Sequence, residues 1–191
     1  MVLANWSQII DPTMKNLIVL SAAVLALASC SKKVTELPEA TDSGSNTFGA
    51  RVNGELWAPQ GKGILPHAPL LEASFAGNDN YVINARNISK SPTETEFEIY
   101  LQGVTRPGTY ALNQTTELRP AHTASYAYFV ERTLTPTHQW MTNAQTTGTV
   151  VITKVDKNAH VLAGTFSFRA TDRNGGEVLD VTEGRFDLTI Q

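Results

Sequence analysis

The sequence predicts an all-β domain, either an antiparallel β-sandwich or a partly closed β-barrel of about nine or ten strands. Apolar residues recur with a period of two over residues 47–191, and no long segment of that range shows the 3.6-residue period of a helix. The same range holds 20 Thr but only four Lys, a composition that favours strands. A domain of about 150 residues buries roughly 68 to 70% of its unfolded surface, so it needs no disulfide.

The first two strands are predicted to form a hairpin. Residues 48–52 (FGARV) alternate, and Asn53-Gly54 then supplies the positive φ angles of a two-residue type I′ turn. Residues 55–58 (ELWA) return along the first strand. In this register Trp57 lies opposite Ala50 and shares its face of the sheet.

Later strands show the same alternation. Their apolar positions fall within residues 71–75, 81–85, 97–101 and 162–170. Turn sequences rich in Gly, Asn, Asp and Pro lie at residues 77–80, 106–108, 156–158 and 172–176. Tight turns between short strands favour antiparallel pairing.

The last strand changes parity. Leu179 and Val181 place the buried face at odd numbers, whereas Phe186 and Leu188 place it at even numbers. One extra residue must intervene, so we expect a β-bulge at residues 182–184, with Gly184 in a left-handed conformation. With the bulge, all four apolar side chains point into one core.

The N-terminus resembles an export signal. Lys15 precedes twelve uncharged, mostly apolar residues, 17–28 (LIVLSAAVLALA), in the order of a secretory leader. As a helix this run spans only about 18 Å, too little for a bilayer core of roughly 30 Å. Residues 1–29 are therefore predicted to be a signal peptide. Residues 1–13 lack leader character, and we interpret them as a start codon assigned too early, with Met14 as the true start.

Residues 27–30 (LASC) resemble the lipobox of bacterial lipoproteins. The resemblance implies that Cys30, the only cysteine, is acylated and becomes the first residue of the mature chain. The alternatives are an unprocessed secretory peptide or a buried free cysteine. Residues 31–46 are polar and rich in Pro and Gly, so residues 30–46 are expected to be a lipidated cysteine and a flexible tether. Ser31 after the cysteine resembles the outer-membrane sorting signal of Gram-negative lipoproteins.

The mature domain resembles a family of small Bacteroidota lipoproteins classified as a domain of unknown function. The likeness lies in residues 48–58 (FGARVNGELWA), 148–154 (GTVVITK), 163–168 (AGTFSF) and 181–187 (VTEGRFD). It covers most of residues 47–191 and is weak between residues 60 and 140. The resemblance implies an exported, lipid-anchored β-domain and brings no known activity or catalytic residue.

Candidate catalytic chemistry is sparse. Glu94, Glu96 and Glu98 lie two apart on one strand, a spacing open to glycoside hydrolysis, to cation binding or to a solvated strand face. The common local motifs of hydrolases, metalloproteases and nucleotide-binding enzymes are absent from the sequence. An enzyme is not indicated.

The sequence gives little support for a metal or cofactor. The four histidines are scattered singly along the chain, at His67, His122, His138 and His160. Residues 172–177 (DRNGGE) faintly resemble a calcium loop but are sufficiently explained as a turn. We expect no metal site and no cofactor.

Aromatic residues offer the leading ligand hypothesis. Tyr126 and Tyr128 share one side of a strand and, with Trp140, are candidates for a platform that stacks on a sugar. The alternative is core packing or cross-strand pairing.

The sequence favours a lipid-anchored domain of the cell envelope, on the periplasmic or outer face of the outer membrane. The expected role is glycan or protein binding, or a structural function. The alternatives are a carboxylate-dependent hydrolase and a small β-barrel that carries an apolar ligand. Charged residues make up 17% of the chain and the net charge is −3, which does not suit nucleic-acid binding.

Overall fold

The computed structural model describes residues 34–61, 69–117, 119 and 124–191. Residues Lys33–Gln191 form one compact unit. The predictions for the leader, for Cys30, and for His67 and His122 lie outside the described residues. Within the described part of the chain, no helix is long and apolar enough to cross a membrane.

The prediction of an all-β antiparallel fold is confirmed. The described residues form eleven strands, slightly more than expected, and no helix. The strands are β1 (Thr47–Val52), β2 (Glu55–Trp57), β3 (Leu71–Phe75), β4 (Tyr81–Asn87), β5 (Glu94–Leu101), β6 (Gly108–Leu112), β7 (Tyr126–Arg132), β8 (Pro136–Met141), β9 (Gly148–Asp156), β10 (Val161–Asp172) and β11 (Val178–Thr189).

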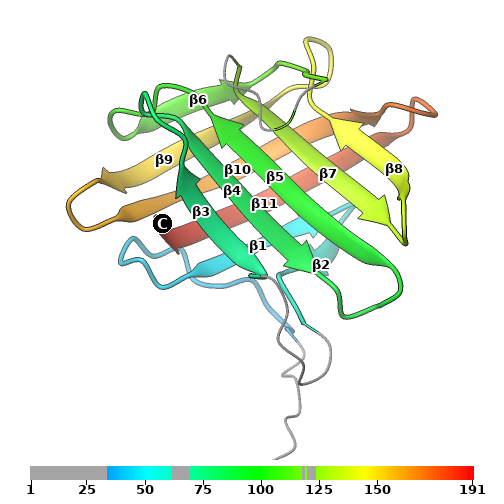
Figure 1. Ribbon diagram of the computed structural model, residues 1–191, viewed down its shortest axis with the longest axis horizontal. Helices are drawn as coiled ribbons and strands as arrows, with labels where there is room; N and C mark the ends of the chain where they lie inside the picture. The colour runs from blue at the N-terminus through cyan, green and yellow to red at the C-terminus, as the bar shows by residue number, and fades with distance from the viewer. Residues whose placement is uncertain (1–33, 62–68, 118, 120–123) are drawn as a thin grey trace, which may run out of the picture. The chain divides into compact units, whose positions relative to one another are not determined.

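All eleven strands belong to one curled antiparallel sheet that forms a half-barrel. Its order is β2-β1-β11-β10-β8-β7-β5-β4-β3, and β6 and β9 branch from β10. In Figure 1 strands β3, β4, β5 and β7 cross in front of β9, β10 and β11. The free edge of β3 meets the end of the last strand, because the Gln191 N–H donates to the Ala73 carbonyl at 2.8 Å. The architecture is therefore a sheet curled on itself, between a sandwich and a partly open barrel.

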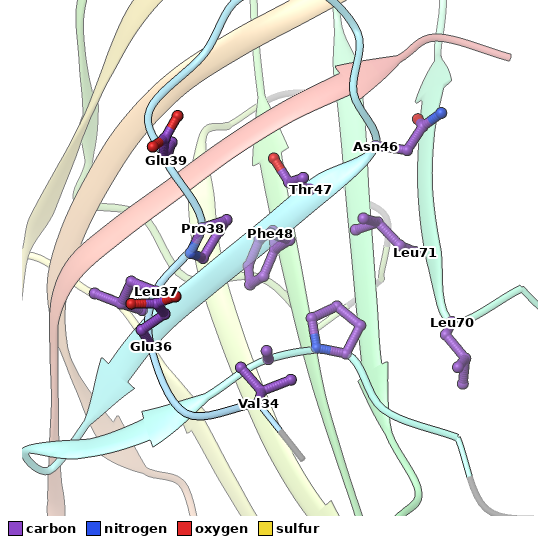
Figure 2. Close-up of a pocket in the computed structure, with 12 residues that line it drawn as sticks. Val34, Glu36, Leu37, Pro38, Glu39, Asn46, Thr47, Phe48, Leu70 and Leu71 are labelled. Carbon is purple, nitrogen blue, oxygen red and sulfur yellow. The ribbon is translucent and has the colours of Figure 1, made fainter. Parts of the chain in front are cut away.

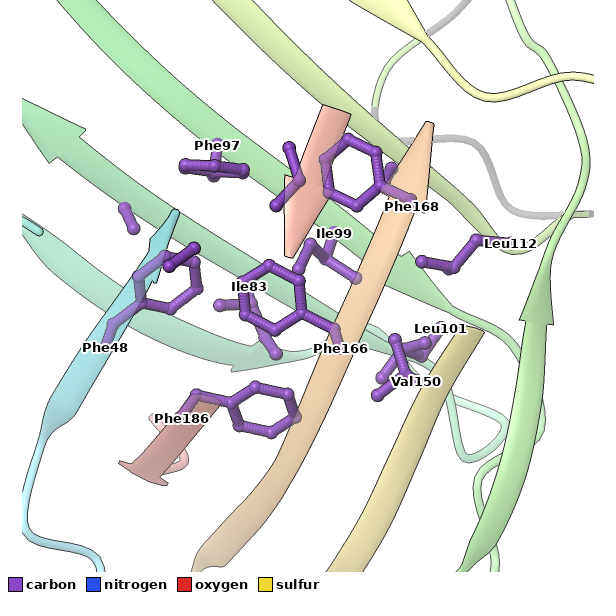
Figure 3. Close-up of a cluster of buried hydrophobic side chains, with 14 of the residues drawn as sticks. Phe48, Ile83, Phe97, Ile99, Leu101, Leu112, Val150, Phe166, Phe168 and Phe186 are labelled. Carbon is purple, nitrogen blue, oxygen red and sulfur yellow. The ribbon is translucent and has the colours of Figure 1, made fainter. Parts of the chain in front are cut away.

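Aromatic side chains fill the concave side of the sheet. Phe97 from β5 lies 5.4 Å from Phe48 of β1 and 6.0 Å from both Phe166 and Phe168 of β10, measured between ring centroids. Figure 3 shows these rings meeting aliphatic side chains from both halves of the sheet. The interior expected of an apolar-ligand carrier is thus occupied by the protein's own side chains.

The predicted first hairpin is confirmed. Asn53 and Gly54 have φ angles of 49° and 83°, as a type I′ turn requires. Ala50 pairs with Trp57, and both side chains are buried. Trp57 packs edge-on against Phe97, with ring centroids 4.6 Å apart.

The predicted bulge in β11 is also confirmed, but the role given to Gly184 is wrong. Phe166 pairs with Gly184 and Phe168 with Val181, so one extra residue lies in β11. The left-handed residue is Glu183, with φ of 52°. Gly184 is required because a Cβ atom there would lie 2.5 Å from the Phe166 ring.

The apolar residues of β11 lie in the core, as expected. Leu179, Val181, Phe186 and Leu188 are each at most 3% exposed and belong to one hydrophobic cluster. The bulge therefore does what the parity change requires, since residues on both of its sides point to the same interior.

The segment expected to be a flexible tether differs from that expectation in residues 34–46. Its residues 41–45 surround the buried Asp187 carboxylate, which accepts hydrogen bonds from the Thr41 hydroxyl at 2.6 Å and the Gly44 N–H at 2.6 Å. Pro38 lies against Gly49, where a Cβ atom would come within 2.7 Å of the proline ring. The polar residues that suggest disorder are ordered here because a carboxylate far away in sequence satisfies their donors.

Candidate functional site

The three aromatic residues expected to bind a ligand do not share a surface. Tyr126 and Tyr128 belong to a cluster on the convex side of β4, β5, β7 and β8, whereas Trp140 points into the main core. Tyr126 is fully buried, and Tyr128 is 2% exposed beneath the Arg119 guanidinium, which lies 3.5 Å from its ring centroid. Of the three, Trp140 is the one that lines a pocket described below.

The three glutamates of β5 share the convex face but have different surroundings. Glu94 accepts a hydrogen bond from Arg86 at 2.8 Å, and Glu96 pairs with Arg132. Arg86 and Arg132 hold the pKa of Glu94 below its usual range. Glu98 accepts a hydrogen bond from the Tyr126 hydroxyl at 2.6 Å, and burial raises its pKa. This face is therefore an ion-pair and hydrogen-bond network, neither a bare solvated face nor an open carboxylate pair.

A pocket of about 320 Å³ lies where four hairpins end at one rim of the half-barrel. We call it the rim pocket. Its walls come from the β1–β2 hairpin, the β4–β5 hairpin, the facing strands β7 and β8, and the turn between β10 and β11. The mouths of curled sheets are preferred ligand sites.

The floor of the rim pocket is aromatic. Ring centroids of Trp57 and Trp140 lie 6.3 and 5.8 Å from that of Phe129, which joins them. The Trp57 Nε1–H donates to the Thr95 hydroxyl at 2.8 Å. Trp140 is 6% exposed, and its Nε1–H has no hydrogen-bond partner. A buried donor without a partner is costly.

A row of polar residues lies next to this aromatic floor, two residues farther along each strand toward the rim. Strand register pairs Asn87 with Thr95, Thr95 with Glu131, and Glu131 with His138. The row below it, Phe97 with Phe129 and Phe129 with Trp140, is aromatic. The concave face thus changes from apolar to polar in one step, which is where a ligand can meet both kinds of side chain.

His138 is held at the edge of this row by a buried carboxylate. Its Nδ1 lies 3.0 Å from Asp172 Oδ2, and its ring stacks on Trp140 with centroids 5.1 Å apart. The hydrogen bond to Asp172 raises the pKa of the His138 imidazole. Asp172 also accepts from the backbone N–H groups of Gln139 and Asn174, so the residues noted as a weak calcium loop form a capped turn.

A larger pocket, of about 520 Å³, lies between β1, β3 and the docked N-terminal segment. Figure 2 shows Val34, Leu37 and Pro38 on one side of it and Leu70 and Leu71 on the other. Its lining combines aliphatic side chains with the polar side chains of Glu36, Glu39, Asn46 and Thr47, and one wall is the docked segment itself. We take the rim pocket as the candidate site because its lining places two indole rings beside amide, hydroxyl and carboxylate groups.

Some features of this site escape analysis of the sequence. Trp57 was predicted only to lie opposite Ala50 in the first hairpin, and neither Thr95 nor Glu131 was predicted to belong to a site. The described residues contain no cluster of three or more His, Cys, Asp or Glu side chains suited to a metal ion.

Comparisons with known proteins give one match. A family described as "Domain of unknown function (DUF6252)" matches residues 45–188. No curated protein and no solved structure matches the chain.

Proposed function

We propose that this chain, which belongs to the DUF6252 family of domains of unknown function, is a lipid-anchored domain of the bacterial outer membrane that binds a saccharide in its rim pocket. The observation that carries the binding proposal is the polar row of Thr95 and Glu131 directly above the rings of Trp57, Phe129 and Trp140. Sugars present apolar C–H faces to aromatic rings and hydroxyls to amide and hydroxyl side chains.

The binding proposal is tested by carbohydrate titration of the full chain. Trp57 and Trp140 are two of the three tryptophans in the chain and both line the pocket, so a ligand that occupies the pocket should change the tryptophan fluorescence. Trp140→Phe keeps a ring but removes the unpartnered donor, and we expect it to weaken binding. Phe75→Leu is the matched control, because Phe75 is a 48% exposed aromatic residue away from this pocket. Saccharide binding that survives Trp140→Phe and Trp57→Leu unchanged contradicts the proposed site.

The proposed location follows from the leader and the LASC sequence that ends at Cys30. Intact-mass analysis of the membrane fraction should give a mature chain that begins at an acylated Cys30. Cys30→Ser should abolish lipid attachment and membrane retention. A mature chain with another first residue, or unchanged membrane retention of Cys30→Ser, contradicts the anchor without bearing on saccharide binding.

A carboxylate-dependent hydrolase is the second candidate function. Glu131 from β7 and Glu177 from the β10–β11 turn both line the rim pocket, and glycosidases use a pair of carboxyl groups that flank the scissile bond. Release of reducing ends from a bound oligosaccharide, lost in Glu131→Gln, would favour hydrolysis. Stable binding without product favours the binding role.

A further inference from the structure

Charge in the rim pocket is unbalanced. The pocket is lined by the carboxylates of Glu55, Glu131 and Glu177 and by a single ammonium group, Lys90. Within the described part of the chain, none of these four side chains forms an ion pair. Glu94 and Glu96 on the convex face are, in contrast, both paired with arginines. The pocket is therefore lined by more carboxylates than ammonium groups, which makes its potential negative.

Glu131 is the most enclosed of the three carboxylates. It is half-buried on the concave face, paired across the strands with Thr95 on one side and His138 on the other. His138 forms no ion pair with Glu131, because the Nδ1 of that ring is directed at the buried Asp172; Asp172 and, at longer range, Glu131 both raise the pKa of the His138 imidazole. A partly desolvated carboxylate attracts a cation more strongly than a fully exposed one.

One indole donor beside the pocket has no hydrogen-bond partner. The Nε1–H of Trp140 has no partner, and the Trp140 side chain, which is more than nine-tenths buried, is one of the residues that line this pocket. A simple metal ion would leave this donor unpaired, and an anionic ligand would be repelled by the carboxylates. A ligand with oxygen acceptors and an ammonium group satisfies both, and indole rings favour a nearby cation.

We infer that the rim pocket selects saccharides that carry a free amino group. This inference rests on the proposed saccharide-binding function. The ammonium group faces Glu131 and the acidic rim, a hydroxyl or ring oxygen accepts from Trp140, and the C–H face of the sugar lies on the indole rings.

The test compares three matched tetrasaccharides, of glucosamine, N-acetylglucosamine and glucose, titrated against the full chain by calorimetry and tryptophan fluorescence. We expect the glucosamine tetramer to bind at least about tenfold more tightly than the other two, with an advantage that shrinks as salt screens the charges. Glu131→Gln should remove most of that advantage, so that the affinity for the glucosamine tetramer falls toward those for the neutral sugars. Glu72→Gln on β3, outside the pocket, should change neither affinity.

The outcomes separate this inference from the proposed function. Equal affinity for the three sugars, or tighter binding of a neutral one, overturns the inference and leaves saccharide binding intact. An advantage for glucosamine that persists in Glu131→Gln at low salt also overturns it, because the selectivity then lies elsewhere. Binding of none of the three overturns the proposed function and the inference together.

Discussion

Replacement of Asp187 by Asn tests how the N-terminal segment is held. Asp187 is fully buried on β11 and accepts hydrogen bonds from the Thr41 hydroxyl and from the backbone N–H groups of Ser43, Gly44 and Ser45. In Asp187→Asn one carboxylate oxygen becomes an NH₂ group that can only donate. Because every partner around the carboxylate is a donor, at least one of these contacts turns repulsive.

The magnitude follows from the pKa of this carboxyl. Burial alone would raise that pKa, but the hydrogen bonds from Thr41 and the backbone N–H groups lower it from 3.8 to about 2. A difference of 1.8 pH units at 1.36 kcal/mol per unit corresponds to about 2.4 kcal/mol in favour of the ionised form. We therefore expect Asp187→Asn to lower the free energy of unfolding by about 2 to 3 kcal/mol.

Equilibrium denaturation of the full chain measures this loss, and hydrogen exchange locates it. The amides of Ser43, Gly44 and Ser45 should exchange faster in Asp187→Asn, since they lose their acceptor. Asp180→Asn is the matched control, because it is the same change at an exposed position of the same strand. A loss below about 0.5 kcal/mol, with unchanged exchange of the three amides, would refute the reasoning.

The stability difference between the wild type and Asp187→Asn should depend on pH. Because the folded pKa of Asp187 lies below the unfolded one, its stabilisation is fully present above pH 3.8 and is lost as the pH falls through about 2. The stability difference between the wild type and Asp187→Asn should therefore shrink between pH 4 and pH 2. A constant difference over that range would contradict the assigned pKa.

Three further predictions concern the core and the ion pairs. Gly184→Ala should destabilise the fold by about 1 to 3 kcal/mol because the new methyl overlaps the Phe166 ring, and a neutral result in chemical denaturation would exclude that overlap. Arg132→Gln should raise the pKa of Glu94 measured by NMR titration, since Arg86 and Arg132 together lower it; an unchanged value would assign the effect to Arg86 alone. Asp172→Asn should lower the pKa of His138, because the hydrogen bond to Asp172 raises it. The pair therefore stabilises the fold below pH 6.5, and this stabilisation is lost as the pH rises through the pKa of His138 in the folded protein. An unshifted titration of His138 by NMR would contradict this.

Local chemistry predicts the parts of this fold that depend on neighbouring residues. Asn53-Gly54 determines a type I′ turn, and the turn then determines that Trp57 faces Ala50. The parity change in the last strand predicts a bulge, because two buried faces of opposite parity cannot otherwise coincide. The role predicted for Gly184 was wrong because the prediction used local sequence alone. Its requirement for glycine comes from Phe166 on another strand, and no local pattern reports that contact.

Long-range contacts explain why the structure of residues 34–46 differs from the flexible tether that the sequence predicts. By composition, residues 31–46 bury too little apolar surface to be ordered. In the fold, Asp187 supplies an acceptor for donors more than 140 positions away, and Arg185 donates to the Pro38 carbonyl at 3.2 Å. Order in residues 34–46 therefore depends on contacts with β11, which composition cannot show.

The rim pocket shows which signal in the sequence points to a site. Apolar alternation identifies the concave face of β5 as far as Phe97, and Thr95 lies two residues outward with the same parity. Strand pairing then places Phe129 and Trp140 in the row of Phe97, and Glu131 and His138 in the row of Thr95. Inward positions remain inward after the core ends, so a polar residue at such a position faces the mouth of the sheet and not the solvent outside. The sequence thus contains both parts of the polar row, Thr95 on β5 and the pair Glu131 and His138 on β7 and β8. That the halves meet depends on the pairing of β5 with β7, strands that are not consecutive, and this pairing follows only from the complete topology.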